Sequence, residues 1–562
     1  MAMSPAFFNW FDTETTGLSA PFDQIVQFAG VRTDADLNYV KDGEFNILVK
    51  PRLDVVPGPK AFSITGISTN ELITKGYCEF EAAAGIRGWL TEKKNSMQIG
   101  FNTLTFDDEV LRNTMFRTMQ DPYKHEFDNQ NSRGDLFRLV MFVYALRPDI
   151  MNFFVNDEGI TRLTLGDTVK ANGIVLENAH DARSDIIATI ELARLIKQAN
   201  PRLWAYWLNL SSANFVKPMI EARKPLVLVD RYLAREQGHM TLALPIIYDE
   251  RSPKKMLCVD LRDDPTELMS LSPEELQRRI FTKKEDLPEG QSIKSIRDMT
   301  INKQPLIAGP EILKGHDKVV TRSGLDIDAC MRHAEMLAKD ESFKGRLIEA
   351  HRSNFGPPGD AYDSIYSGGL IGSAETKLRL EVRQPEKPVE GQAPLPALVN
   401  TDPKAISNKL PDPLRMHELT LRAKWANYGD EVLARGQYTK AELRNWIEHL
   451  ERVWFEPKAG KYAINVDGYH ASMLEVKAST VLDERQQQAL SELNDHVTAS
   501  LEKIETLKLR LNEMERAEAL ANSVPVEAPV YEEENAAFIA EHPAEERVLD
   551  VSSKHEDSAL SI

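Results

Sequence analysis

Two carboxylates stand at the end of an apolar stretch near the start of the chain. Residues 7–11 read Phe-Phe-Asn-Trp-Phe, and Asp12, Thr13 and Glu14 follow. In a β-strand, residues two positions apart point to the same face, so Asp12 and Glu14 are expected to lie together. Two neighbouring like charges repel, and a bound cation would relieve that repulsion. The pattern indicates a metal site, although a strand that simply ends in a polar loop would look the same.

A third carboxylate comes from the stretch 100–111, Gly-Phe-Asn-Thr-Leu-Thr-Phe-Asp-Asp-Glu-Val-Leu. A predicted strand gives way here to a loop and then to a helix that begins near Asp107. The start of a helix tolerates an anion because its backbone amides are free and its dipole is positive there. Asp108 and Glu109 compete for the same role, and an acidic helix cap without any metal is the alternative.

The stretch 180–185, His-Asp-Ala-Arg-Ser-Asp, adds a histidine and a fourth carboxylate. Asp185 begins an amphipathic helix and can point into the site. His180 lies more than one helical turn earlier, so it can sit in a loop over the site. Histidine titrates near neutral pH and can take a proton from water. The alternative is an exposed loop histidine, and Asp181 is most simply a capping or surface acid.

The four carboxylates and the histidine together predict hydrolysis of a phosphodiester. A site of oxygen ligands without sulfur suits the hard cations Mg²⁺ and Mn²⁺. Two such ions about 4 Å apart can stabilise the attacking and leaving oxygens of an in-line displacement. The histidine would deprotonate the attacking water. The sequence contains no P-loop, no GxSxG motif and no dinucleotide fingerprint that would indicate other chemistry.

These residues need a scaffold, and the first 200 residues predict an α/β domain with a mixed sheet. Besides the opening strand, apolar runs predict strands at 25–31, 45–49 and 97–102. Helical periodicity predicts helices at 81–90, 135–146, 162–172 and 185–197.

The remainder of the chain predicts two further regions and a tail. Residues 201–354 carry short strands at 226–229, 240–247 and 255–260 with helical inserts at 272–281 and 326–338, which suits a small β barrel or sheet. Residues 355–520 are helical, with segments at 414–428, 439–455 and 482–518. The proline-rich segment 384–413 is typical of a flexible linker or insertion. Residues 521–562 form an acidic tail that we expect to be disordered.

Composition bounds the location and the partners. The chain has 562 residues, 42% of them hydrophobic and 27% charged, and only three cysteines, Cys78, Cys258 and Cys330. Few cysteines without ligand spacing predict a reducing cytoplasm. No apolar run reaches the roughly 20 residues that span a bilayer, and no signal peptide is recognisable. The net charge is −18; ten acids against two bases after residue 524 account for −8, so a basic groove elsewhere is not excluded.

The motifs resemble those of the DEDDh branch of 3′→5′ exonucleases, which have an RNase H-like fold. That branch carries Asp-x-Glu, then Asn-x-x-x-Phe-Asp, then His-x4-Asp, and this chain has Asp12 and Glu14, Asp107 after Phe106, and His180 with Asp185. The resemblance implies that the four acids hold two metal ions and that His180 is the general base. It would make Asp12 the bridging ligand and Glu14 a ligand of one ion.

Further stretches extend the resemblance over roughly residues 5–455 to bacterial members of this branch that act on DNA. It implies an RNase H-like nuclease domain, an SH3-like β domain and an all-α C-terminal region that enclose a channel for single-stranded DNA. It also implies a partner, single-stranded DNA-binding protein, recognised through its acidic C-terminal tail. Candidate contacts for DNA or that tail, with a surface ion-pair role as the alternative, are Arg133, Arg147, Tyr206 and Lys224.

The resulting hypothesis is a Mg²⁺-dependent 3′→5′ exonuclease that degrades single-stranded DNA to 5′-mononucleotides in DNA repair, as a cytoplasmic monomer. Two alternatives remain. The same chemistry could act on RNA 3′ ends, because the site residues do not distinguish the two sugars. A catalytically silent single-strand-binding scaffold is the other, although an intact set of five site residues argues against it.

Overall fold

The computed structural model describes residues 4–523 except 176–181, 251, 290, 292–294, 353–358, 368, 370, 388–393, 409, 411, 458–462 and 480. His180, Asp181 and the acidic tail from residue 524 lie outside the described residues, so the expectations for them stay predictions. Among the described helices, none combines the length and the apolar character that crossing a membrane requires.

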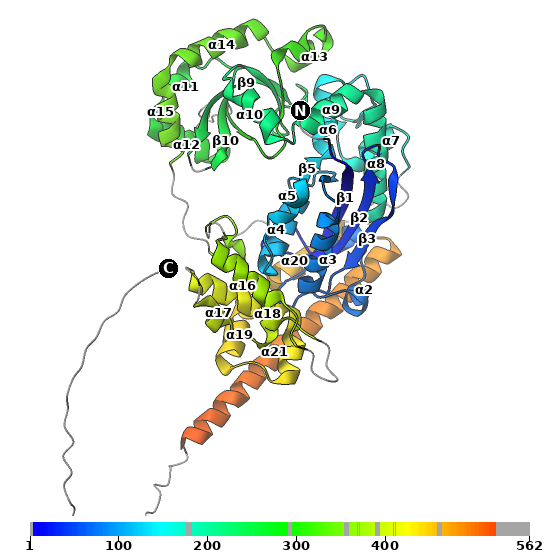
Figure 1. Cartoon of the computed structure of the whole chain (residues 1–562), viewed down its shortest axis with the longest axis vertical. Coiled ribbons are helices and arrows are strands. Elements are labelled where there is room, and N and C mark those ends of the chain that lie inside the picture. Colours follow the sequence, from blue (N-terminus) through cyan, green and yellow to red (C-terminus); the bar gives the residue numbers. More distant parts are fainter. Residues whose placement is uncertain are drawn as a thin grey trace, which may run out of the picture. The chain divides into compact units, whose positions relative to one another are not determined.

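A five-stranded mixed sheet organises the N-terminal region (Figure 1). Its strand order is β3-β2-β1-β4-β5, with β1 antiparallel to β2 and parallel to β4. The strands are β1 (Phe7–Thr15), β2 (Ile25–Asp34), β3 (Tyr39–Leu48), β4 (Ser96–Gly100) and β5 (Ser132–Asp135). Four of them were predicted. β5 was missed because its four residues contain no apolar run.

Helices pack on both faces of this sheet. Strand alternation directs Trp10 to the face covered by α8 (Ala182–Ala199) and Phe11 to the face covered by α3 (Glu79–Glu92) and α4 (Asp107–Arg117). Phe11 stacks on Phe28 of β2 with ring centroids 5.6 Å apart. The other elements of the region are α1 (Pro59–Thr65), α2 (Thr69–Lys75), α5 (Lys124–Phe127), α6 (Leu136–Leu146), β6 (Phe154–Val155), β7 (Thr161–Arg162) and α7 (Leu165–Ala171).

A second five-stranded sheet, in the order β11-β10-β9-β8-β12 and antiparallel throughout, forms the β region. Its strands are β8 (Leu226–Val229), β9 (Met240–Asp249), β10 (Ser252–Asp260), β11 (Ile296–Thr300) and β12 (Leu306–Ala308). Helices α9 (Pro201–Asn209) and α10 (Ala213–Glu221) lead into it, and its inserts are α11 (Thr266–Ser270), α12 (Pro273–Phe281), α13 (Asp317–Ser323), α14 (Ile327–Lys339) and α15 (Glu341–Ala350).

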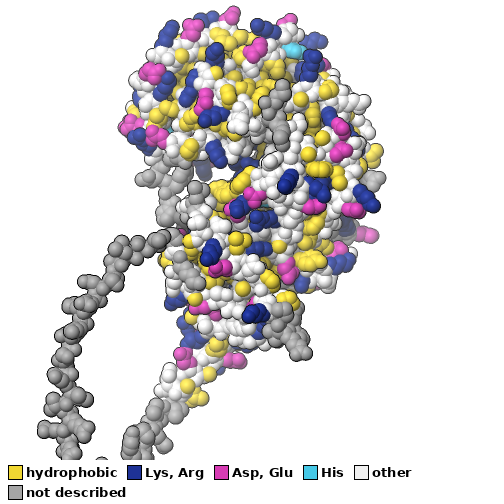
Figure 2. Space-filling model, viewed as in Figure 1, with side chains coloured by type: hydrophobic (Ala, Val, Ile, Leu, Met, Phe, Trp, Pro, Cys, Tyr) yellow, Lys and Arg dark blue, Asp and Glu magenta, His cyan; other side chains and the backbone are white. Residues whose placement is uncertain are grey.

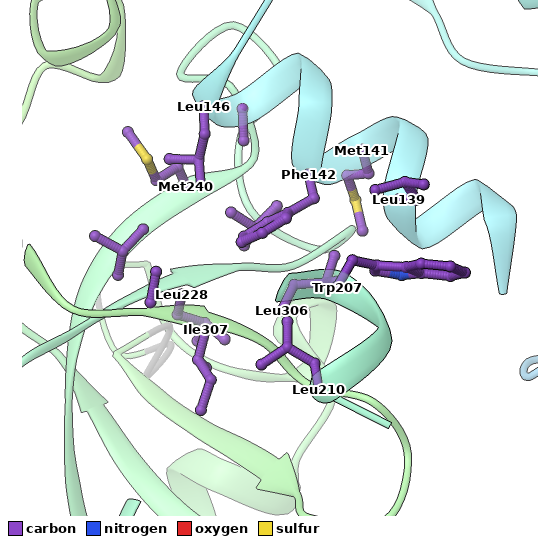
Figure 3. Packing of buried hydrophobic residues seen from close by; sticks show 14 of the residues in the cluster. Leu139, Met141, Phe142, Leu146, Trp207, Leu210, Leu228, Met240, Leu306 and Ile307 are labelled. Atoms are coloured by element: carbon purple, nitrogen blue, oxygen red, sulfur yellow. The ribbon is translucent and has the colours of Figure 1, made fainter. Parts of the chain in front are cut away.

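The first region and the β region share one hydrophobic core. Figure 3 shows Phe142 of α6 beside Leu228, Met240 and Ile307 of the β sheet, and Trp207 of α9 below α6 in the same cluster. All five side chains are at most 3% exposed. Burial of this many apolar side chains is worth about 1.5–3 kcal/mol for each one. The β region is therefore fixed against the sheet that carries Asp12, and the domain boundaries at residues 200 and 354 stay predictions.

The C-terminal region is helical, as predicted. Its helices are α16 (Ser373–Arg383), α17 (Pro403–Ser407), α18 (Pro413–Arg435), α19 (Lys440–Phe455), α20 (Val466–Ser479) and α21 (Glu484–Ser523). The predicted apolar stripe of α21 is buried at Leu490, Leu493, Val497 and Ile504. The compact unit that contains both sheets extends to Lys508. The fold class is the predicted one: an α/β region with a mixed sheet, a β region and an all-α C-terminal region.

The described part of the proline-rich segment differs from the flexible linker that its composition predicted. Leu398 and Val399 lie in a 3₁₀ turn, Ala397–Asn400, and both are fully buried. Ile406 of α17 is also buried, and α17 packs on α18. The prolines set the turns, whereas the few apolar residues between them supply the contacts that anchor the segment.

Candidate active site

The first two predicted acids lie on one face of β1. Asp12 and Glu14 are half-buried, whereas their neighbours Thr13 and Thr15 are buried on the opposite face. Parallel pairing with β4 ends at Trp10, opposite Ile99, so both acids lie beyond the part of β1 that pairs with β4, although β1 stays paired with β2 as far as Thr15. The side-chain alternation of a strand therefore gives the predicted arrangement.

Gly100 brings the end of β4 close to the backbone that precedes Asp12. A Cβ at this position would lie 2.4 Å from the Phe11 carbonyl oxygen and 2.3 Å from a methyl group of Thr103. Any larger residue would push β1 and the following loop apart. Glycine is required here because the end of β4 and the backbone of β1 approach each other so closely.

Asp107 is the first residue of α4, and Thr13 fixes its carboxylate. The Thr13 hydroxyl donates to Oδ1 of Asp107 at 2.5 Å, and the Thr13 backbone amide donates to the same oxygen at 3.2 Å. Burial raises the pKa of Asp107 to about 7, against the opposing effect of these hydrogen bonds. Among the described residues, no basic side chain forms an ion pair with Asp107.

The two competing acids of this stretch are already neutralised. Asp108 Oδ2 pairs with Arg133 at 2.8 Å, and Glu109 pairs with Arg112 at 2.7 Å and with Lys303 at 3.4 Å. A cation would therefore gain more from Asp107, which lacks such a partner, than from its neighbours. This contrast favours Asp107 over its two neighbours, and its role as a metal ligand stays a prediction.

Asp185 reaches the same end of the sheet from α8. Asp12 and Asp185 both line a cavity of about 130 Å³, together with Gly100, Phe101, Leu165 and Thr189. Residues distant in sequence thus meet at the end of the central strand, and α8 positions Asp185 by packing on β1 and β2. His180 precedes α8 but lies outside the described residues.

The donor set fits hard divalent cations, although it is not a closed ligand shell. Within the described part of the chain, no three His, Cys, Asp or Glu side chains are arranged to hold one metal ion. Asp12 and Asp185 line one cavity and Glu14 shares the face of Asp12, whereas Asp107 is bound by Thr13 on the opposite face of β1. Burial of a carboxylate without a countercharge, as at Asp107, is unfavourable unless a cation approaches or the group takes up a proton. The residues present therefore fit such ions, and their individual roles stay predictions.

Two of the predicted contact residues have structural partners. Arg133 is nearly buried and forms ion pairs with Asp108 and with Glu126, at 2.8 and 3.2 Å. Tyr206 donates its hydroxyl to the Ile307 carbonyl oxygen at 2.9 Å. Arg133 also donates to the Asn302 carbonyl oxygen at 3.3 Å, and Tyr206 stacks on Phe142 of α6. Both residues therefore help to join the first region to the β region, and their roles in binding DNA or a partner stay predictions.

The other two lie at the surface. Arg147 is partly exposed and pairs with Asp149 at 2.8 Å, an ion pair of small energetic value. Lys224 is exposed. Both side chains are accessible to a partner.

Sequence reasoning missed a groove beside the start of α4. A cavity of about 240 Å³ is lined by Thr105, Glu109, Arg138, Arg231, Tyr232 and Lys303, among others. Tyr232 is 79% exposed. Figure 2 shows Lys and Arg side chains bordering a hollow below the β region. The signal that could have found the groove is the basic–aromatic pair of Arg231 and Tyr232, in the turn after β8.

Comparison with known proteins agrees with this fold and site. A family model described as "Exonuclease" matches residues 9–193, and a model described as "Exonuclease I SH3-like domain" matches residues 212–353. The β region is therefore SH3-like. The first region, which carries the carboxylates, is an exonuclease domain. Exonucleases of this type are hydrolases that depend on metal ions.

Relatives along most of the chain define the family more closely. Exodeoxyribonuclease I of Haemophilus influenzae is 35% identical over 342 residues, which are 60% of this chain and 72% of the relative. Exodeoxyribonuclease I of Escherichia coli is 29% identical over 490 residues, which are 86% of this chain and 95% of the relative. The chain belongs to the exodeoxyribonuclease I family.

Solved structures give the same result. E. coli exonuclease I in complex with a dA16 oligonucleotide matches with a TM-score of 0.75 and 26% identity, over 88% of this chain and all of that one. A structure described as SSB/exonuclease I with an inhibitor matches with a TM-score of 0.74 and 25% identity, with the same coverage.

Proposed function

We propose that this chain degrades single-stranded DNA from its 3′ end to 5′-mononucleotides, by metal-dependent phosphodiester hydrolysis, in DNA repair and recombination. The observation that carries the proposal is the meeting of Asp12 and Asp185 in one cavity at the end of the central strand, with Glu14 on the face of Asp12. The family of the chain and the oligonucleotide bound by its E. coli relative support DNA as the substrate.

The carboxylates Asp12, Glu14, Asp107 and Asp185 would hold two Mg²⁺ ions, for which Mn²⁺ could substitute. These are oxygen ligands, which hard cations prefer. Bound there, the ions would supply Lewis-acid stabilisation of the charge that develops on the phosphodiester.

Other residues would support hydrolysis without binding a metal ion. His180 would accept the proton of the attacking water, since an imidazole is half-protonated near neutral pH. Thr13 holds the Asp107 carboxylate in one orientation through its hydroxyl. The buried apolar part of β1, including Phe8, Trp10 and Phe11, keeps the two strand acids rigidly placed.

The groove between the exonuclease region and the SH3-like region would guide the DNA. Tyr232 offers an exposed ring on which a base can stack, and Lys303 offers a cation for a phosphate. Arg147 and Lys224, which are accessible, would bind the acidic C-terminal tail of single-stranded DNA-binding protein; the solved SSB/exonuclease I structure supports such a partner. We further propose a monomer in a reducing cytoplasm, consistent with the free thiols of Cys78, Cys258 and Cys330.

One digestion experiment tests the proposal against its alternatives. The full chain is incubated with 5′-labelled single-stranded DNA, duplex DNA or RNA, with Mg²⁺ or with EDTA. A ladder that shortens from the 3′ end on single-stranded DNA with Mg²⁺ alone is the expected result. Faster loss of RNA would favour the RNA alternative, and no degradation would favour the silent scaffold.

Two variants connect the activity to the site. Asp12→Ala and Asp185→Ala are expected to abolish degradation while circular dichroism and thermal melting stay close to those of the wild type. Asp149→Ala, in the exposed pair with Arg147, is the matched control and should degrade DNA at the wild-type rate. Substantial Mg²⁺-dependent activity in either site variant would contradict the site assignment.

A further inference from the structure

The loop that joins β4 to α4 determines where Asp107 lies. Residues 101–106 form successive turns, and Asp107 is the first residue of the helix that follows. The loop is anchored at both ends: the Asn102 backbone amide donates to Asp135 Oδ1 at 2.8 Å, and the Asp108 amide donates to the Thr103 carbonyl at 3.0 Å. Asn102 has a φ of 68°, in the left-handed region that asparagine tolerates better than most residues.

Arg231 of the SH3-like region holds this loop from outside. Its Nη1 donates to Asn102 Oδ1 and to Thr105 Oγ1, both at 3.1 Å, so one nitrogen joins the first turn of the loop to the last. The guanidinium lies 5.3 Å from the ring centroid of Phe137. Phe137 in turn packs edge-on against Phe101, with centroids 5.6 Å apart. Arg231 therefore contacts both the polar groups of the loop and the aromatic pair at its start.

Asp107 is thus restrained from two directions. Thr13 binds its carboxylate from the sheet side, and the loop before it is held by Arg231 from the side of the SH3-like region. Asn102 is the first residue of the Asn-x-x-x-Phe-Asp motif, and its side-chain oxygen accepts the hydrogen bond from Arg231. The sequence did not suggest this role, because Arg231 follows β8, far along the chain.

We propose that Arg231 is a positioning residue for the active site: it acts through Asn102 and the loop 101–106 to hold Asp107 in place for hydrolysis. The SH3-like region thereby contributes to catalysis and not only to binding DNA. The activity measurements below depend on the proposed function, and the hydrogen-exchange measurement does not.

A phosphate contact is the competing role for an arginine beside this groove, and kinetics separates the two. Loss of a phosphate contact weakens binding of every substrate, raises KM and lowers the salt dependence of binding. Loss of positioning lowers kcat, because a displaced Asp107 carboxylate would stabilise the transition state less, while binding of the substrate would change little.

The test uses the full chain with Arg231→Ala, Arg231→Lys, Asn102→Ala and the double variant Arg231→Ala/Asn102→Ala. Arg235→Ala, an exposed arginine four residues further along the same segment, is the matched control. We expect Arg231→Ala to lower kcat about 10-fold on a single-stranded oligonucleotide while KM changes less than about twofold. Lysine keeps a donor nitrogen but lacks the planar guanidinium that lies against Phe137, so Arg231→Lys should fall between the wild type and Arg231→Ala. Arg235→Ala should match the wild type.

The double variant and an exchange experiment complete the test. If Arg231 acts through Asn102, the double variant should be within about twofold of Arg231→Ala, instead of showing the product of the two single effects. Amide hydrogen exchange of residues 101–106 in the metal-free protein should be several-fold faster in Arg231→Ala than in the wild type or Arg235→Ala. A raised KM with unchanged kcat, multiplicative effects, or unchanged exchange of the loop would overturn the proposal. Absence of DNA degradation by the wild type would instead contradict the proposed function, and the exchange result would still decide the positioning role.

Discussion

The Thr13 hydroxyl lies 2.5 Å from Asp107 Oδ1, on the face of β1 opposite to Asp12 and Glu14. One short stretch of strand therefore supplies two acids to one face and, from the residue between them, the hydrogen bond that orients a third. The strand and the start of α4 are connected through this contact, so a change at Thr13 should affect the active site without removing any carboxylate.

Replacing Thr13 with valine should lower activity without unfolding the protein. Valine preserves the shape but removes the hydroxyl, so from Thr13 the Asp107 carboxylate keeps the backbone amide at 3.2 Å and loses the shorter bond. We expect kcat to fall about 10-fold or more, and the free energy of unfolding to fall by about 1–3 kcal/mol because a buried acceptor loses its donor. Steady-state kinetics on single-stranded DNA and urea unfolding measure the two effects. Thr13→Ser keeps the hydroxyl and should stay near wild-type activity; a serine variant as slow as the valine variant would contradict this role.

Replacing His180 with alanine should slow hydrolysis about 10²–10⁴-fold, the range for loss of a general acid or base. DNA binding should change little, because the carboxylates and the groove remain. The acidic limb of the pH–rate profile near neutral pH should also disappear with the imidazole. Asp181→Ala, one residue along, is the matched control and should retain wild-type rates. An equal loss in both variants would show that the segment, and not the imidazole, is required.

The periodicity of the sequence predicted much of this site. Asp12 and Glu14 share a face because a strand alternates, and Asp185 lies in the first turn of an amphipathic helix whose apolar side packs on the sheet. The contacts between regions could not be predicted in this way. Arg231 lies in a turn after β8, and nothing in its local sequence indicates that it reaches Asn102 and Thr105.

Composition alone also failed to predict the structure of the proline-rich segment. Seven prolines between residues 384 and 413 indicated a flexible linker, yet Leu398, Val399 and Ile406 are buried. Average composition does not reveal whether a neighbouring surface accepts a few apolar side chains. Here α18 provides that surface to α17.

Asp135 should make stability depend on pH. Burial raises its pKa to about 6, opposed by Arg138, and its Oδ2 has no hydrogen-bond partner among the described residues. Because the folded-state pKa is raised above the ordinary value of 3.8, the native state favours the protonated form. The stabilising contribution is therefore present below about pH 4 and is lost as the pH rises to about 6.

The variant Asp135→Asn, which cannot ionise, isolates this contribution. Its free energy of unfolding relative to the wild type should increase between pH 4 and pH 7 by up to about 3 kcal/mol and then level off. Urea unfolding at several pH values measures the difference. Any constant that the asparagine side chain adds to it does not change how the difference varies with pH. Asp263→Asn, at an exposed position, is the control and should run parallel to the wild type. A flat difference for Asp135→Asn would contradict the raised pKa.

Glu79 should be essential for stability although it is remote from the proposed chemistry. Its buried carboxylate pairs with Arg52 at 2.5 Å and with Arg117 at 2.6 Å. Burial alone would raise the pKa of Glu79, but Arg117 and Arg52 outweigh it and hold that pKa below its usual range. Arg52 also pairs with Asp54, which accepts hydrogen bonds from Tyr362 and His449 of the C-terminal half. The network thus joins the exonuclease region to the helical region.

Glu79→Gln keeps the shape of the side chain but leaves two buried guanidinium groups with too little negative charge. Removing one partner of a buried ion pair typically costs about 3–5 kcal/mol, and we expect a loss of that size in urea unfolding. Glu44→Gln is the matched control, because Glu44 and its partner Arg183 are 60% and 55% exposed. Such a surface pair is worth at most about 1 kcal/mol. If both variants lost the same amount, the Glu79 network would contribute no more than a surface ion pair. If only Glu79→Gln were strongly destabilised, the pairing of its buried charge with Arg52 and Arg117 would be what makes Glu79 essential for stability.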